Sequence, residues 1–191
     1  MFEKKYRIAA ISAATLTAAL VLSGCTSTQS GSNTNMMGSS QNASAFSGTD
    51  IMFAQMMIPH HQQAVEMAQL AKKNTTNPEV LALADQIEKA QAPEIEQMTK
   101  WIKSSGASMD MGHDMPMDGM LTSERMSVLS AATGPAFDTL FLQGMIAHHQ
   151  GAIAMADLIA QSTNPEAKKL AEAIVTGQTA EIATMQKLLG Q

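Results

Sequence analysis

The feature that most constrains the fold is a stretch of sequence that occurs twice, 88 residues apart. The first copy, residues 50–71, reads DIMFAQMMIPHHQQAVEMAQLA, and the second, residues 138–159, reads DTLFLQGMIAHHQGAIAMADLI. Apolar residues and one histidine recur in each copy at intervals of four and three, which draws one continuous stripe along an α-helix. The stripes consist of Phe53, Met57, His60, Ala64, Met67 and Ala71, and of Phe141, Met145, His148, Ala152, Met155 and Ile159. We therefore expect two related helices, each with a histidine in the middle of a buried face.

A second helix is predicted after each copy, beyond a short polar turn that spans residues 72–77 in the first. The turns end in Asn77-Pro78-Glu79 and Asn164-Pro165-Glu166, where asparagine is typical of an N-cap and proline of the first helical position. Each copy is therefore a helical hairpin, and no stretch indicates a strand. We predict an all-α four-helix bundle made of two repeated hairpins. The predicted domain covers residues 49–191, with repeat 1 at 49–103, a connection at 104–134 that holds a short helix from about 122 to 132, and repeat 2 at 135–191.

The first 24 residues are predicted to be a lipoprotein signal peptide. A basic start with Lys4, Lys5 and Arg7 precedes an apolar run that is too short for a spanning helix, and Leu-Ser-Gly-Cys follows. This pattern resembles the bacterial lipobox, which implies cleavage before Cys25 and lipid attachment to its sulfur. Because Cys25 is the only cysteine, it cannot form an internal disulfide. Residues 25–48, rich in Ser, Thr, Asn, Gln and Gly, are predicted to be a flexible tether.

Removal of the signal peptide would change the net charge from −5 to −7. An acidic exported chain is poorly suited to nucleic acid and has a favourable field for cations. We therefore expect an exported protein that is anchored by lipid to a bacterial membrane, on its periplasmic or extracellular face, and that does not bind nucleic acid.

A polar layer is predicted to cross the core at the height of the histidines. Residues equally far from the turn of an antiparallel hairpin lie at the same height, so the facing residues can be counted. His60 comes level with Gln91 and Met57 with Glu94, and in the second hairpin His148 comes level with Gln178 and Met145 with Glu181. Burying such groups costs on the order of a few kcal/mol each unless they are hydrogen-bonded, ion-paired or metal-bound.

Two interpretations of this layer remain open. In the structural one, His60 and His148 hydrogen-bond the facing glutamates and fix the helix register. The metal interpretation rests on the doubling of the histidines and on the thioethers beside them, although core packing alone also accounts for Met67, Met98, Met155 and Met185 taken singly. The candidate ligands are His60, His61, His148, His149, Met57, Met67, Met98, Met145, Met155, Met185, Glu94 and Glu181.

The connection between the repeats adds a second set of candidate ligands. It holds several methionines and a histidine without any apolar periodicity that a core could use. Thioether sulfur suits Cu(I), imidazole suits both copper oxidation states, and neither ligand is lost to disulfides in an oxidising compartment. A flexible connector of chance composition is the alternative. The candidate loop ligands are Met109, Met111, His113, Met115, Met117 and Met120.

The paired motif resembles a family of bacterial secreted proteins known as domain of unknown function 305. Its pattern is an aspartate, an aromatic residue and Met-x-x-His-His-x-x-Ala-x-x-Met, then Glu-x-x-x-Met on a second helix. The resemblance covers residues 49–189 and implies a ferritin-like fold with two helices per repeat, and a link to copper binding and copper tolerance in some members. The matching residues are Asp50, Phe53, Met57, His60, His61, Ala64, Met67, Glu94 and Met98, and Asp138, Phe141, Met145, His148, His149, Ala152, Met155, Glu181 and Met185.

The first repeat departs from the second at two prolines. Pro59 and Pro93 stand where the second repeat has Ala147 and Ala180. A proline inside a helix removes an amide donor and usually causes a kink. We hypothesise that the first hairpin is locally opened beside His60, which makes its site the more accessible one. Alternatively, Pro59 starts the helix and the residues before it form a separate short segment.

The ligand set favours a non-enzymatic copper protein. A di-iron oxidase of ferritin-like type needs Glu-x-x-His motifs, and no glutamate has a histidine three residues on. Zinc suits the histidines and silver resembles Cu(I), but zinc leaves the methionine-rich connection unexplained. The sequence thus predicts sequestration or delivery of copper in copper tolerance, with the metal ion, the membrane and a copper-handling protein as partners. The alternative is a structural or protein-interaction bundle with a buried His, Glu and Gln layer and no physiological metal.

Overall fold

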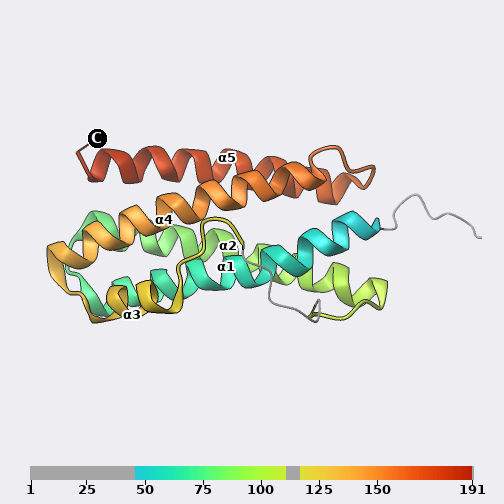
Figure 1. The fold of residues 1–191 in the computed structure, drawn as a ribbon. Helices are drawn as coiled ribbons and strands as arrows, with labels where there is room; N and C mark the ends of the chain where they lie inside the picture. The colour runs from blue at the N-terminus through green and yellow to red at the C-terminus, as the bar shows by residue number, and fades with distance from the viewer. Residues whose placement is uncertain (1–45, 111–116, 191) are drawn as a thin grey trace, which may run out of the picture. The chain divides into compact units, whose positions relative to one another are not determined.

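The computed structural model describes residues 46–110 and 117–190 (Figure 1). The elements are α1 (Gly48–Asn74), α2 (Pro78–Ser105), α3 (Ser123–Ala131), α4 (Gly134–Ala156), the 3-10 helix η1 (Asp157–Ile159) and α5 (Pro165–Leu188). This part of the chain contains helices and no strand, which confirms the all-α prediction. None of these helices combines the length and the hydropathy that a membrane span requires. The predicted signal peptide, Cys25 and the tether up to residue 45 lie outside the described residues.

The helices start where the sequence places capping residues. Asn77 accepts hydrogen bonds from the backbone N–H groups that follow it at the start of α2, and Asn164 does the same for α5. Ser47 and Asp50 form a reciprocal capping box at the start of α1. The predicted end of this helix at Ala71 is too early, because Lys72 and Lys73 form its last turn, where a basic side chain interacts favourably with the helix dipole.

Both prolines of the first repeat lie inside continuous helices. Pro59 is in the middle of α1 and Pro93 is in the second half of α2. The alternative in which Pro59 starts the helix is therefore wrong. Packing of α1 along its length keeps it helical although one backbone hydrogen bond is missing at the proline.

The two hairpins form a four-helix bundle, as predicted. α1 packs mainly on α2 and α4 mainly on α5, while α1 and α4 make most of the contacts between the hairpins. α2 and α5 contact each other little, and the short α3 lies against α1 and α4. Figure 1 shows α4 running between α5 and the first hairpin. The two helices that carry the His-His motif are thus the central pair of the bundle.

The core consists of two apolar clusters with a gap between them. One cluster is built from the first half of α1, the end of α2, the end of α4 with η1, and the first half of α5. The other is built from the opposite halves of the same four helices together with Leu129 of α3. No residue in 59–63, 88–97, 146–151 or 175–184 is a fully buried member of either cluster. The polar layer predicted from the sequence occupies this gap.

Candidate metal-binding site

Four histidines lie at the centre of the bundle between the two apolar clusters. His60 and His61 come from α1 and His148 and His149 from α4, and all four are completely buried. The layer also contains Gln91 and Glu94 from α2 and Gln178 and Glu181 from α5, of which only Glu94 is not fully buried. All four long helices therefore contribute to one polar layer, and the structure brings together the predicted histidines, glutamines and glutamates.

The first histidine of each pair faces the other repeat. The rings of His60 and His148 lie 3.8 Å apart between centroids with an angle of 40° between their planes. The expectation that these two histidines hydrogen-bond the glutamates of their own hairpins is wrong. The reason is that the stripe on each motif helix faces the other motif helix across the central contact of α1 and α4.

The second histidine of each pair contacts the glutamate of its own hairpin. His61 Nε2–H donates to Glu94 Oε2 at 2.8 Å, and His149 Nε2–H donates to Glu181 Oε2 at 2.7 Å. These second histidines lie outside the predicted stripe, but they are as buried as the first ones. A carboxylate that accepts from Nε2–H fixes the ring and directs the Nδ1 lone pair of the neutral imidazole to a ligand.

The two histidine–glutamate pairs differ in their surroundings. The Glu94 side chain is 19% exposed and that of Glu181 only 4%. Glu181 also accepts a second hydrogen bond, from Gln86 Nε2 to its Oε1 at 3.1 Å, which links α2 to α5. Glu94 is thus the more open of the two glutamates, but His60 is as buried as His148, so the structure shows no opening beside His60.

Burial makes His60 and His148 weak bases. Desolvation, opposed by the hydrogen bond to Asp118 and reinforced by His61 and His149, lowers the pKa of His60 to about 4. Desolvation and the three neighbouring histidines lower the pKa of His148 to about 2. Both imidazoles are therefore neutral near pH 7, which is the form that binds a metal ion.

Several buried polar atoms of the layer have no hydrogen-bond partner in the protein. These are Nδ1 of His60, His61 and His149, both ring nitrogens of His148, and both side-chain amide atoms of Gln91 and Gln178. Buried polar groups without a partner are rare in native proteins, and each calls for an explanation such as an ion or a buried water. The unpartnered nitrogens are the donor type that copper and zinc bind, so the residues fit a metal ion.

Six of the predicted methionine ligands flank the layer, three on each side. Met57, Met98 and Met155 belong to one apolar cluster or pack against it, and Met67, Met145 and Met185 belong to the other. Each trio takes two methionines from one repeat and the third from the other. All are fully buried except the half-buried Met155. The thioethers thus form two equivalent sets on the two sides of the histidines.

A short segment at residues 117–121, here called the strap, covers His60 and His148. Its Asp118 carbonyl accepts from His60 Nε2–H at 3.2 Å. Figure 1 shows the strap, in yellow, against the middle of α4. Gln63 and Gly151 contact the strap, and neither is among the predicted site residues. The signal that could have found them is that these two residues occupy the same position of the motif in the two repeats.

The methionine-rich connection is only partly described. Met109 is 46% exposed, while Met117 and Met120 are half-buried in the strap. Met120 also lines a groove of about 640 Å³ between the strap, α3 and α4. The predicted ligands Met111, His113 and Met115 lie outside the described residues, so the structure does not place the loop as one site.

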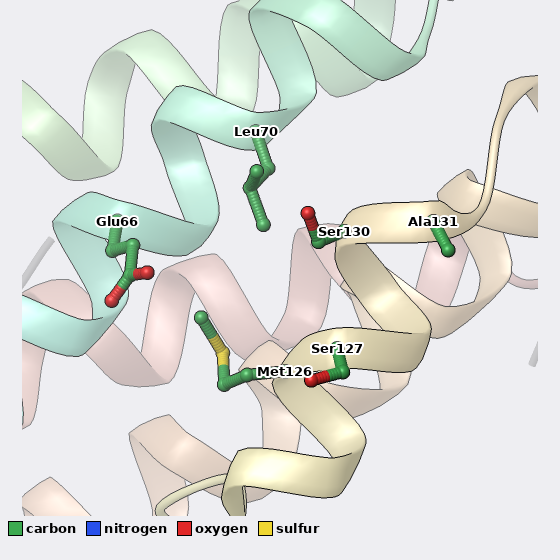
Figure 2. A pocket seen from close by; sticks show the side chains of 6 residues that line it. All are labelled: Glu66, Leu70, Met126, Ser127, Ser130 and Ala131. Carbon is green, nitrogen blue, oxygen red and sulfur yellow. The ribbon is translucent and has the colours of Figure 1, made fainter.

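No three His, Cys, Asp or Glu side chains within residues 46–110 and 117–190 form a group that could hold one ion. A site in the layer therefore combines at most two such side chains with other ligands, such as thioethers. Figure 2 shows a separate surface pocket of about 430 Å³ between α1 and α3, into which Met126 reaches from α3. The pocket contains none of the four histidines, and its one thioether and one carboxylate, from Glu66, make a weak ligand set.

The chain is similar to several solved structures. A DUF305 protein from Streptomyces coelicolor is 33% identical, with a TM-score of 0.71 over 74% of this chain and 92% of that one. A DUF305 fragment from Deinococcus radiodurans is 31% identical, with a TM-score of 0.69 over 75% and 97%. CopM in its Cu(I)-bound form is 33% identical, with a TM-score of 0.62 over 73% and 94%. CopM has also been solved in Cu(II)-bound and silver-bound forms.

A search of curated proteins finds no significant match to the chain. The family model described as domain of unknown function, DUF305, matches residues 50–189, which span both hairpins and the connection. The resemblance seen in the His-His motifs is thereby confirmed. This chain belongs to the DUF305 family.

Proposed function

We propose that this protein binds copper outside the cytoplasm and sequesters it or passes it on, without catalysing a reaction. The observation that carries the proposal is the set of five unpartnered imidazole nitrogens in a buried layer with three thioethers on each side. A related protein, CopM, is known in Cu(I)-bound and Cu(II)-bound forms, which supports a metal-related role for this chain.

The chemistry of the layer favours a soft, monovalent cargo. Thioether sulfur and neutral imidazole are ligands that Cu(I) accepts at low coordination number, and neither brings a negative charge into the core. The candidate ligands, from which one ion would take at most two histidines, are the four histidines together with Met57, Met98, Met155, Met67, Met145 and Met185. Silver shares these preferences and is a probe for the same site, and CopM has been solved with it.

We assign Glu94 and Glu181 to the histidines rather than to the ion. Each carboxylate accepts a hydrogen bond from Nε2–H of the second histidine of its motif. A carboxylate in this position holds the ring orientation and raises the basicity of the opposite nitrogen. The glutamates then have a positioning role, which modifies the expectation that they are ligands.

A structural bundle without a physiological metal is the second candidate. It is favoured by the same two histidine–glutamate pairs, because they satisfy one nitrogen of His61 and His149 without any ion. It leaves the glutamine amides and both nitrogens of His148 unexplained. Thermal stability separates the two candidates, since a ligand that binds only the folded state raises it by mass action.

The proposal includes export and lipid attachment at Cys25. It rests on the basic start, the apolar run and the Leu-Ser-Gly-Cys pattern, and the relative from Streptomyces coelicolor is named as a candidate secreted protein. The test is labelling of cells with a radioactive fatty acid. We expect label in the parent protein and none in Cys25→Ser.

The binding proposal is tested by anaerobic titration of Cu(I) against a chromophoric chelator. The protein carries Cys25→Ser, so that its thiol does not contribute a ligand. We compare it with a variant that has alanine at all four layer histidines and with a variant that has alanine at His113 and leucine at Met109, Met111, Met115, Met117 and Met120. Loss of competitive binding only in the histidine variant supports the bundle site, and loss only in the second variant moves the function to the connection.

A further inference from the structure

The two copies of the His-His motif differ at the position three residues after their first histidine. This position holds Gln63 in the first repeat and Gly151 in the second. A glutamine and a glycine have nothing in common in size or polarity. The structure shows that both residues contact the same piece of chain, the strap at residues 117–121. Within the described residues a single strap serves both repeats, so the two copies of the motif differ at this position.

The side chain of Gln63 binds the backbone of the strap. Its Nε2 donates to the Leu121 carbonyl at 2.9 Å, and its Oε1 accepts from the Leu121 N–H at 2.7 Å. The side-chain amide thus pairs with both backbone groups of one residue, as a neighbouring β-strand would. This contact fixes the end of the strap to α1 by two hydrogen bonds of good length.

Gly151 gives the strap room on the opposite side. A Cβ atom at Gly151 would lie 1.9 Å from the Asp118 carbonyl oxygen and 2.6 Å from the carbonyl carbon. Gly119, with φ of +85°, is equally constrained, because a Cβ there would lie 2.3 Å from the Ala147 carbonyl oxygen. The backbones of the strap and α4 are therefore in direct contact, which only glycine permits.

The strap closes the site from one side. The Asp118 carbonyl accepts a hydrogen bond from His60 Nε2–H. The strap backbone at Gly119 lies close to the Cα of His148. Neither His60 nor His148 has any solvent exposure. A ligand that arrives from this side has to displace the strap.

We propose that Gln63, Gly119 and Gly151 form a latch that holds the strap over His60 and His148, and that copper reaches this pair by release of the strap. The loading route rests on the proposed function, while the latch itself is a property of the metal-free chain. Gln63 and Gly151 are positioning residues in this account, since they act on the strap and do not touch the ion. In this account, the strap controls access to the histidines of both repeats.

The test uses hydrogen–deuterium exchange of the full chain with Cys25→Ser, alone and after anaerobic loading with Cu(I). Gly151→Ala adds a methyl group that the strap backbone has to avoid. Gly177→Ala is the matched control, because it also replaces a helical glycine, with nothing within 4 Å of the added Cβ. A second pair, Gln63→Ala and the exposed Gln62→Ala, keeps the test valid if Gly151→Ala fails to fold.

We expect the amides of residues 119–122 to exchange at least roughly tenfold faster in Gly151→Ala and Gln63→Ala than in the parent and in both controls. Cu(I) should raise the exchange of the same amides in the parent, and transfer of Cu(I) from a chromophoric chelator should be faster in the two latch variants. Parent-like exchange in both latch variants would overturn the latch. Unchanged strap exchange in a parent chain that does bind Cu(I) would overturn the loading route alone. Absence of Cu(I) binding by the parent would overturn the proposed function and the route together, and the titration identifies that case.

Discussion

His60 and His61 are neighbours in sequence and contact different helices. A helix turns about 100° per residue, so two adjacent side chains reach two different partners. His60 meets His148 across the repeats, and His61 meets Glu94 within its hairpin. The same division holds for His148 and His149. A doubled histidine is thus the shortest sequence that can join the two hairpins and orient an imidazole in each.

The two glutamates allow a matched test at this scale. Glu181 uses both carboxylate oxygens, one for His149 and one for Gln86, whereas Glu94 uses one. A glutamine offers one acceptor oxygen, so Glu181→Gln cannot accept from both His149 and Gln86, whereas Glu94→Gln can still accept from His61. We expect Glu181→Gln to lower the free energy of unfolding by about 2 kcal/mol and Glu94→Gln by less than about 1 kcal/mol, measured by urea denaturation. Equal losses would contradict the assigned contacts.

The burial of His60 and His148 predicts that the metal-free protein is sensitive to acid. Their folded pKa values, about 4 for His60 and about 2 for His148, lie below the value of 6.5 in an unfolded chain. Below pH 6.5 the unfolded state therefore binds more protons than the folded state. The free energy of unfolding has its full value above pH 6.5 and decreases as the pH falls below it. The expected slope between pH 6 and 4.5 is about 1.4 kcal/mol per pH unit for each histidine.

Urea denaturation at a series of pH values measures this slope. The control is the double variant His60→Gln, His148→Gln, in which the slope should become much smaller. A free energy of unfolding that stays constant from pH 6.5 to 4.5 in the parent would show that the two histidines are not buried as neutral rings.

At the scale of helices, the elements could be predicted from the sequence and the contacts between them only in part. Caps at Asn77 and Asn164 have local signatures, and both helices begin where these residues indicated. The stripe with His60 predicts which residues share a helix face, but it does not predict which neighbouring helix that face contacts. The strap was missed because its contacts are made by backbone atoms, which carry no residue pattern.

The second repeat shows which residue can replace a proline of the first repeat inside the same helix. Pro93 is exposed and lies inside α2, and its equivalent Ala180 lies inside α5. Pro93→Ala restores a backbone hydrogen bond, and part of the gain is lost because the unfolded chain becomes more flexible. We expect the variant to raise the free energy of unfolding by about 1 kcal/mol, measured by urea denaturation. A decrease would mean that α2 needs the proline for its packing.

Over the whole described molecule, the duplication produces one shared layer rather than two separate sites. The contact of His60 with His148 joins the repeats, Gln86 crosses from α2 to Glu181, and each methionine trio draws on both hairpins. A single hairpin contains two histidines and an incomplete set of thioethers. Binding and the assembly of the bundle are therefore expected to be coupled, because the ligands converge only when the hairpins pack.

The central claim is that the buried histidine layer binds Cu(I). The most direct measurement is anaerobic competition for Cu(I) between a chromophoric chelator and the Cys25→Ser protein, beside the variant with alanine at His60, His61, His148 and His149. The account predicts that the parent withdraws copper from the chelator and that the histidine variant, shown by circular dichroism to remain helical, does not. Equal withdrawal by the two proteins would contradict the claim and leave the histidines as a structural layer.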